Sequence, residues 1–359
     1  MPATDRTVTV PTAPADLDAL HEPGYERPGT ARPDGNGETP QSFVTVVVAF
    51  TANLLVAIAK SIVAGITGSA SLLAEAAHSW ADTGNEVFLL IAERRARKAP
   101  DERQPLGYGR EAYVWALFAA LGLFAAGSAV SITHGINELR SPEPAEHFLL
   151  GYLVLAVAFV LEGISFLQSV RQARREAAGM DRDLLEHVMV TSDPTLRAVF
   201  AEDAAALIGL VIAAAGLLAH QLTGSSTPDA IASILLGVML GVVAIVLINR
   251  NRRFLVGQEA DPRVRSATIA ALLRMPEVDR VTALRLEVVG PRRMYLVADV
   301  DLAGDDVEHR TAVRLRALEA RICESPVIVA ATLSLSAPDE PSLVARTDPA
   351  PPEERGVQQ

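Results

Sequence analysis

The stretch Glu75-Ala-Ala-His-Ser-Trp-Ala-Asp-Thr-Gly-Asn-Glu86 lies inside an apolar run, residues 66–92, that is long enough to cross a bilayer. Four ionisable side chains recur in it at i, i+3, i+7 and i+11: Glu75, His78, Asp82 and Glu86. At about 3.6 residues per turn, this spacing predicts that all four share one face of a helix. A charged side chain at bilayer depth costs about 2.5 kcal/mol or more, so such groups normally face a bundle interior and mark an ion or proton path.

His78 and Asp82 stand one helical turn apart and form a two-ligand clamp for a metal ion. An imidazole nitrogen and a carboxylate oxygen suit a borderline divalent cation such as zinc. The alternative is a buried polar pair that links neighbouring helices. Because four ionisable groups occupy one membrane face, we favour a transport or metal role over a linking role.

The composition separates apolar blocks from charged ones. Of 359 residues, 50% are hydrophobic and 21% are charged, and the mean hydropathy is +0.25. This combination predicts a membrane bundle joined to a soluble part. The formal net charge of −11 argues against nucleic-acid binding. The single cysteine, Cys323, excludes a disulfide framework and a thiolate metal site, and we expect no prosthetic group.

Six apolar blocks approach the ~20 residues that a spanning helix needs. They lie at 42–65, 70–93, 110–138, 148–171, 194–219 and 228–250. We therefore expect a six-helix transmembrane domain over 42–257. Small residues are dense in the third and sixth blocks, Gly237 among them, which predicts close helix contacts. Residues 1–41 and 337–359 are rich in Pro and polar residues, which predicts disordered tails.

The C-terminal part, residues 258–336, has the pattern of a small soluble α+β domain. The periodicities predict helices at 262–273 and 309–323 and strands at 281–289, 293–302 and 327–335. The order α-β-β-α-β fits a ferredoxin-like unit. The expected fold class is thus a membrane α-helical bundle of six helices with a C-terminal ferredoxin-like domain.

Lysine and arginine concentrate in the loops after the second, fourth and sixth apolar blocks. The loops on the opposite side hold only Arg140. Because cytosolic loops carry the excess of basic residues, this asymmetry predicts a multi-pass membrane protein with both termini in the cytosol. We expect it in a bacterial plasma membrane. The amphipathic segment 179–193, after the fourth block, predicts a surface helix that carries His187.

The fifth block carries the adjacent acids Glu202 and Asp203. Neighbouring helix residues point about 100° apart, so both cannot face one ion equally. One is expected to face the second helix, and the other then needs a separate partner or a proton. Asn53 in the first block and Glu162 in the fourth are further polar candidates. Lys60 has no ligand role, because an ammonium cannot coordinate a cation, and we expect it to snorkel or to pair with an acid.

Three motifs stand out between residues 42 and 336: Gly68-Ser-Ala-Ser-Leu-Leu-Ala-Glu-Ala-Ala-His-Ser-Trp-Ala-Asp82, Pro105-Leu-Gly-Tyr-Gly-Arg110 and Gly135-Ile-Asn-Glu-Leu-Arg-Ser-Pro142. With these motifs the chain resembles the cation diffusion facilitators, six-helix antiporters that exchange zinc or other divalent cations for protons. This resemblance implies a homodimer with a tetrahedral metal site near the bilayer midplane, with ligands from the second and fifth helices.

The ligand pattern of that family is matched in part. His78 and Asp82 match in the second helix and Asp203 matches in the fifth, where the usual histidine position holds Val199. The fourth ligand is then Glu202, Asn53 or water. The Glu202-Asp203 pair, the Asp193-Pro194 start of the fifth helix and Glu162 resemble the branch that includes the animal mitochondrial zinc transporter.

Two further positions depart from metal-rich family members. Tyr108 stands where members with a metal site in the loop before the third helix have a histidine. The soluble part contains a single histidine, His309. We therefore expect a C-terminal domain that dimerises without a cluster of metal ligands.

These patterns lead to one functional hypothesis, the secondary active export of a divalent metal from the cytosol in exchange for protons. Zinc is the first choice, and a carboxylate-rich site also admits Mn²⁺, Fe²⁺ or Co²⁺. Glu75 and Glu86 either hand the ion or proton along the path or serve as structural partners. An enzyme is not expected, because neither a His-Glu-x-x-His motif nor a nucleophile elbow occurs. A channel and a non-transporting membrane scaffold are the rival hypotheses.

Overall fold

The computed structural model describes residues 41–142, 147–180 and 182–345, which form two compact units. The first unit comprises residues 41–258 with Val289–Arg292, and the second comprises residues 259–288 and 293–345. The two predicted tails lie mainly outside the described residues, so their disorder stays a prediction.

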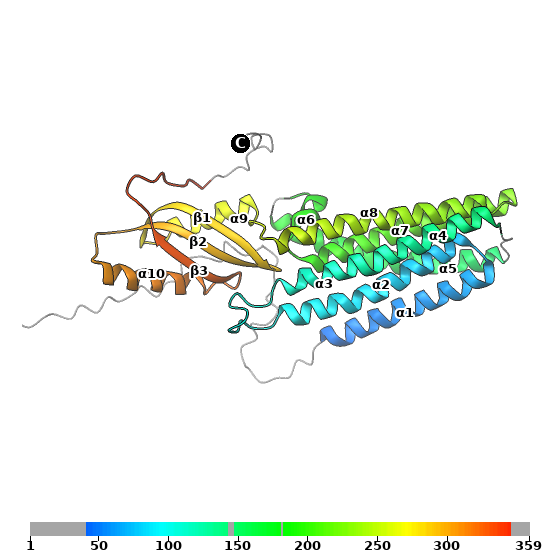
Figure 1. Ribbon diagram of the computed structural model, residues 1–359, viewed down its shortest axis with the longest axis horizontal. Helices are drawn as coiled ribbons and strands as arrows, with labels where there is room; N and C mark the ends of the chain where they lie inside the picture. Colours follow the sequence, from blue (N-terminus) through cyan, green and yellow to red (C-terminus); the bar gives the residue numbers. More distant parts are fainter. Residues whose placement is uncertain (1–40, 143–146, 181, 346–359) are drawn as a thin grey trace, which may run out of the picture. The chain divides into compact units, whose positions relative to one another are not determined.

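The first unit is a bundle of long helices that lie side by side (Figure 1). α1 packs on α2, α5 on α7, and α8 on both α4 and α7. The third predicted block forms α3, η2 and α4 without a break, and η2 is a single π-helical turn. The elements are α1 (Gln41–Thr67), α2 (Ala70–Ala96), α3 (Glu111–Ala119), η2 (Ala120–Phe124), α4 (Ala125–Arg140), α5 (Phe148–Gly179), α6 (Leu184–Val190), α7 (Pro194–Thr223) and α8 (Thr227–Leu255).

Four of these helical segments are long and apolar enough to cross a membrane: Glu111–Arg140, Phe148–Gly179, Pro194–Thr223 and Thr227–Leu255. In α1 the stretch Asn53–Thr67 is apolar but shorter. α2 has the length, but its acids and its basic last turn lower its hydropathy. The structure therefore supports four of the six predicted spans, and the count of six stays a prediction.

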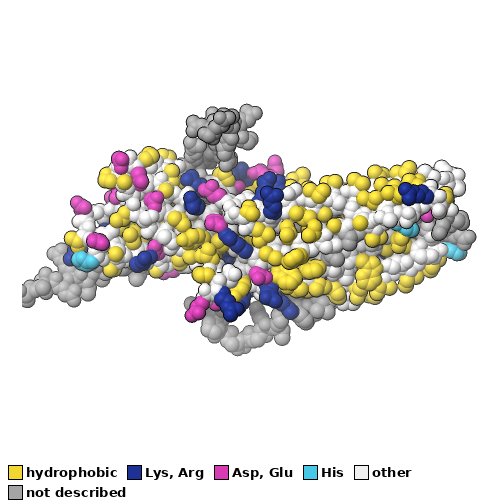
Figure 2. Space-filling model, viewed as in Figure 1, with side chains coloured by type: hydrophobic (Ala, Val, Ile, Leu, Met, Phe, Trp, Pro, Cys, Tyr) yellow, Lys and Arg dark blue, Asp and Glu magenta, His cyan; other side chains and the backbone are white. Residues whose placement is uncertain are grey.

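Apolar side chains also cover the outside of the bundle. Figure 2 shows hydrophobic side chains spread along the long helices, whereas Lys and Arg gather toward one end of them. Leu153 on α5, Val211 on α7 and Ile245 on α8 are 62%, 57% and 60% exposed. An apolar surface of this extent is typical of helices that lie in lipid.

The ends of α2 and α7 follow from their local sequences. Gly68 has φ +66°, a conformation that glycine adopts without steric cost, and it separates α1 from α2. Ser69 then caps α2 by accepting a hydrogen bond from the Leu72 amide at 3.2 Å. Asp193 caps α7 by accepting from the amides of Thr195 and Leu196, and Pro194 fills the first helical position.

The helices approach one another closely where small residues meet. A Cβ atom on Gly237 of α8 would lie 2.6 Å from Ile132 on α4, so only glycine fits there. An apolar core formed by α1, α2, α5, α7 and α8 includes Leu72, Leu155, Leu210 and Leu217. The expectation that small residues mediate close helix contacts is confirmed at Gly237.

The second unit contains a three-stranded mixed sheet with strand order β1-β2-β3. β1 and β2 are joined by two residues and are therefore antiparallel, whereas β2 and β3 pair in parallel with Leu296 opposite Ala331. Buried and partly exposed residues alternate along β2, as the sequence predicts. The elements are α9 (Pro262–Leu273), β1 (Val278–Gly290), β2 (Arg293–Leu302), α10 (Glu308–Ile322) and β3 (Ile328–Leu335). The ferredoxin-like classification stays a prediction.

The predicted surface helix between α5 and α7 forms as α6, with Leu185 exposed and His187 on its buried face. The sequence predicts His187 on a surface helix, and α6 does form there, but the imidazole is completely buried. Its Nε2 atom lies 3.4 Å from Oε2 of Glu176 on α5. The reason is that α6 folds against α5 and α7, which a seven-residue segment does not reveal by its own periodicity.

Candidate metal-ion site

The polar face of α2 forms as the spacing predicts. Glu75 is completely buried and His78 is 2% exposed. Nδ1 of His78 lies 3.5 Å from Oδ1 of Asp82, one turn further along the helix. This places a nitrogen donor and an oxygen donor side by side within the bundle.

The adjacent acids of α7 point to different helices. Glu202 accepts a hydrogen bond from the side-chain amide of Asn85 on α2. Asp203 instead accepts from the Ser165 hydroxyl on α5, at 3.1 and 3.2 Å from its two oxygens. Glu202 is therefore the α7 carboxylate that faces the polar face of α2.

Asn85 is a residue of this site that the sequence analysis did not single out. Its signal was present, because it follows His78 by seven positions and Asp82 by three, and so falls on the same helix face. It is 1% exposed. A buried amide of this kind needs a hydrogen-bond partner, which Glu202 supplies.

α1 supplies partners to the two outer acids of the α2 face. Nζ of Lys60 lies 3.0 Å from Oε2 of Glu75, and both side chains are completely buried. Asn53 donates a hydrogen bond from its side-chain amide to Oε1 of Glu86. Lys60 therefore pairs with an acid, which is one of the two roles expected for it.

Glu162 on α5 adds a further carboxylate. Its charge interacts with those of Asp82, Glu86 and Asp203. Four helices, α1, α2, α5 and α7, thus contribute ionisable or amide side chains to one region of the bundle. Like charges repel, so a cation in this region would be stabilised by these acids.

The acids do not form one preformed ligand sphere, because those of α2 and α7 each contact a side chain that is not an acid. Within the described residues, no group of three or more His, Cys, Asp and Glu side chains is close enough to hold a metal ion. Glu202, Asp203 and Glu86 each accept from an amide or a hydroxyl on another helix. To form a four-ligand sphere, these carboxylates would have to exchange their hydrogen bonds with the neutral donors for bonds to the metal ion.

The loop before α3 is organised by Tyr108, at the position where a histidine would have suggested a second metal site. The Tyr108 hydroxyl donates to Oδ2 of Asp101 at 2.7 Å, and Nζ of Lys98 lies 3.0 Å from the same atom. The hydrogen bond from Tyr108 and then that from Lys98 lower the pKa of Asp101 to about 2. Asp101 is thus held ionised by protein donors.

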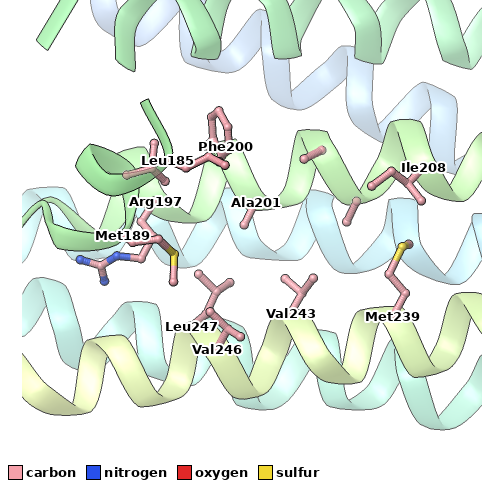
Figure 3. A pocket seen from close by; sticks show the side chains of 13 residues that line it. Leu185, Met189, Arg197, Phe200, Ala201, Ile208, Met239, Val243, Val246 and Leu247 are labelled. Atoms are coloured by element: carbon pink, nitrogen blue, oxygen red, sulfur yellow. The ribbon is translucent and has the colours of Figure 1, made fainter. Parts of the chain in front are cut away.

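The bundle also contains a cavity of about 220 Å³ between α6, α7 and α8 (Figure 3). Its lining is apolar, with Leu185, Met239 and Val243 among its residues, and the charged side chain that borders it is Arg197. The Arg197 guanidinium donates to Asn251 and to the Thr191 carbonyl. Because carboxylates and imidazoles do not line it, this cavity is not a cation site.

Comparison with known proteins identifies the class of protein to which this chain belongs. Residues 46–256 match the cation efflux transmembrane domain, and the chain belongs to the cation efflux family. The chain is accordingly an integral membrane protein of a transporter family. This confirms the resemblance that the helix motifs indicated.

Three relatives place the chain within the family. Metal tolerance protein C4 of Arabidopsis thaliana is 36% identical over 262 residues, which are 73% of this chain and 57% of that protein. The mitochondrial proton-coupled zinc antiporter SLC30A9 of Homo sapiens is 31% identical over 259 residues, 72% of this chain and 46% of that protein. The cation-efflux pump FieF of Shewanella oneidensis is 28% identical over 241 residues, 67% of this chain and 75% of that protein.

The chain spans about half the length of the first two of these relatives. The similarity to SLC30A9 confirms the branch that the Glu202-Asp203 pair and Glu162 suggested.

Proposed function

We propose that this protein is a secondary active transporter that exports a divalent metal cation, with Zn²⁺ as the first choice, from the cytosol in exchange for protons. Membership of the cation efflux family supports the transport class. A relative named a proton-coupled zinc antiporter supports the ion and the counter-ion. The observation that carries the proposal is the buried His78–Asp82 pair, together with the electrostatic interaction of Asp82 with Glu202 on α7 and Glu162 on α5.

The proposed ligands are His78 and Asp82 of α2 together with Glu202 and Asp203 of α7. Glu202 is the better placed of the two α7 acids, because its carboxylate already contacts the α2 face through Asn85. An arriving dication replaces the Asn85 amide as the partner of Glu202. Asp203 joins the sphere only if α7 turns away from Ser165, since the two carboxylates diverge by about 100° around the helix.

Proton coupling follows from the chemistry of these ligands. A metal ion binds neutral imidazole and ionised carboxylate, so binding displaces protons and protons compete for the site. Rocking of the helices then exposes the site to each side of the membrane in turn. Glu86, Asn53 and Glu162 line the approach and stabilise the ion or a proton along it, whereas Glu75 serves as the structural partner of Lys60.

The remaining architecture is proposed with the function. Six spanning helices over 42–257, a cytosolic ferredoxin-like domain over 258–336, cytosolic termini and a homodimer agree with the basic loops and with the family. Residues such as Arg94 and Arg95 end α2, and Arg252 and Arg253 end α8, on the side proposed as cytosolic.

A second candidate is an exporter of Mn²⁺, Fe²⁺ or Co²⁺ with the same fold. It is favoured by the ratio of carboxylates to imidazoles, since one imidazole and several acids surround the site. Competition between metals in one assay separates the two candidates. Preferred transport of Mn²⁺ over Zn²⁺ at equal concentration would favour the second.

Transport by purified protein in proteoliposomes tests the proposal. A pH gradient should drive uptake of ⁶⁵Zn, and His78→Ala and Asp82→Ala should each lower the rate by at least about 100-fold, as expected when a ligand is lost from a metal site. His220→Ala is the matched control, because His220 is also buried in the bundle but packs edge-on against Phe148.

The paired variants Glu202→Gln and Asp203→Asn assign the α7 ligand. We expect the larger loss with Glu202→Gln, since Glu202 faces α2. Unchanged transport in both His78→Ala and Asp82→Ala would contradict the proposed site. An uptake rate that does not depend on the pH gradient would contradict the coupling to protons.

A further inference from the structure

Lys60 is a completely buried lysine in a cation transporter, which is an electrostatically costly choice. Its ammonium lies 3.0 Å from Oε2 of Glu75, and neither side chain is exposed. A buried ammonium needs a close opposite charge, and Glu75 supplies it. The other oxygen of that carboxylate, Oε1, has no hydrogen-bond partner among the described residues.

The position of this pair relates it to the proposed ion site. Glu75 precedes His78 by three residues and Asp82 by seven on the same face of α2, so the residue that holds the ammonium is about one helical turn from His78 along the helix. The Lys60 charge acts electrostatically on His78, Asp82 and Glu162. Lys60 is therefore a fixed positive charge on a face otherwise built from acids and one imidazole.

The surroundings hold the Glu75 carboxylate in place. Gly209 of α7 packs directly against its Oε1 atom, where a Cβ atom would collide with it. α1, α2 and α7 thus meet at this carboxylate. With Lys60 present, the carboxylate is neutralised by a protein cation and offers little attraction to a metal ion.

We propose that Lys60 is a specificity-determining residue that neutralises the Glu75 carboxylate. The neutralised carboxylate does not bind a second dication at this end of the α2 face. The path therefore holds one dication at a time, at His78 and Asp82. The inference rests on the proposed function and adds the number of ions carried at a time. Lys60 does not ligate the ion. It acts through Glu75 and through its charge.

Zinc binding by the purified full chain in detergent, measured by calorimetry with Zn²⁺ alone, tests this role. The wild type should bind one Zn²⁺ per chain. Glu75→Gln leaves the Lys60 charge uncompensated beside the site and should weaken Zn²⁺ binding at least about tenfold, because a unit charge one helical turn away in a bundle interior repels the ion strongly. Lys60→Gln/Glu75→Gln removes both charges and should restore the affinity to within about threefold.

The single variant Lys60→Gln provides a second, independent test by the same Zn²⁺-binding measurement. This test remains available if Glu75→Gln does not fold. The Lys60→Gln substitution releases the Glu75 carboxylate, whose charge also interacts with that of Glu162, and we expect two Zn²⁺ per chain in place of one. Asp229→Asn is the matched control: Asp229 is buried and accepts from the Ala70 amide at 2.7 Å at the start of α2. Its loss should leave both the affinity and the number of ions unchanged.

A merely structural Lys60–Glu75 contact gives different results. If the contact is only structural, Lys60→Gln should bind one Zn²⁺ with wild-type affinity, or the double variant should bind Zn²⁺ as weakly as Glu75→Gln does. Either result would overturn the inference. If the wild type itself binds no Zn²⁺ or other dication, the proposed function fails and the inference fails with it. If the wild type binds one Zn²⁺ and Lys60→Gln also binds one, only the role of Lys60 is refuted.

Discussion

Two ion pairs, one in each unit, show how differently the same chemistry is used. In the membrane unit, Lys60 and Glu75 are both completely buried and share one contact of 3.0 Å. In the soluble unit, Arg321 donates two hydrogen bonds to Glu277, at 2.8 and 2.6 Å, and these side chains remain 14% and 24% exposed. Water can replace a lost partner in the second pair but not in the first.

The two ion pairs differ in their access to water, and this difference decides how much each pair contributes to stability. The bidentate pair of Arg321 and Glu277 near the surface links α10 to the turn before β1 and contributes modestly to stability. A fully buried pair with a single contact is a weak source of stability, because desolvation offsets the attraction. The buried pair in the membrane unit therefore fits the role in ion selectivity proposed for Lys60 better than a role in stability.

The largest expected effect comes from breaking the buried pair on one side. Lys60→Met leaves Glu75 uncompensated, and we expect a loss of about 3–5 kcal/mol in stability. Lys60→Met/Glu75→Leu removes both charges and should recover most of the loss. Thermal unfolding of the purified variants in detergent measures both, and equal destabilisation of the single and double variants would contradict the assigned pairing.

A smaller effect is expected from crowding the same carboxylate. Gly209→Ala places a Cβ atom against Oε1 of Glu75 and 3.1 Å from Leu236 on α8, so either these side chains or the helices that carry them must shift. Overpacking of this kind costs about 1–3 kcal/mol. Gly65→Ala is the control, because open space surrounds Gly65 on α1 and alanine should stabilise that helix by about 0.5–1 kcal/mol. A Gly209→Ala variant as stable as Gly65→Ala would show that the Glu75 and Leu236 side chains move aside without strain.

The smallest effect is expected in the soluble unit. Arg321→Leu should reduce the protection of β1 and α10 in hydrogen exchange by up to about 1 kcal/mol at neutral pH. Arg316→Leu on the same helix is the control, because Arg316 is 80% exposed in its pair with Glu319 and should contribute less.

The pH dependence of the Arg321→Leu effect has a defined sign. The hydrogen bonds from Arg321 lower the pKa of Glu277 below its ordinary value. A carboxylate with a lowered folded-state pKa stabilises the fold above its unfolded pKa of about 4.3 and loses this contribution as the pH falls through the folded value. The difference between variant and wild type should therefore shrink below about pH 4. A difference that is constant with pH would show that packing of the arginine, and not its charge, supplies the stability.

Much of this protein follows from its sequence alone. The run from Glu75 to Glu86 predicts one polar helix face, and the structure forms it. Ser69, Asp193 and Pro194 mark helix starts that the structure confirms, because capping depends on residues within one turn. The order of helices and strands in the soluble unit likewise follows from local periodicity. The burial of His187 did not follow, because it depends on how α6 packs.

The tertiary structure decided which partner each charged side chain has. Spacing along α7 shows that Glu202 and Asp203 diverge, but only packing shows that Glu202 meets Asn85 and that Asp203 meets Ser165. The pairing of Lys60 with Glu75 is likewise set by the contact of α1 with α2. The physical reason is that local spacing fixes the angles of side chains around one helix, whereas the rotation of that helix against its neighbours depends on many contacts distributed over the whole bundle.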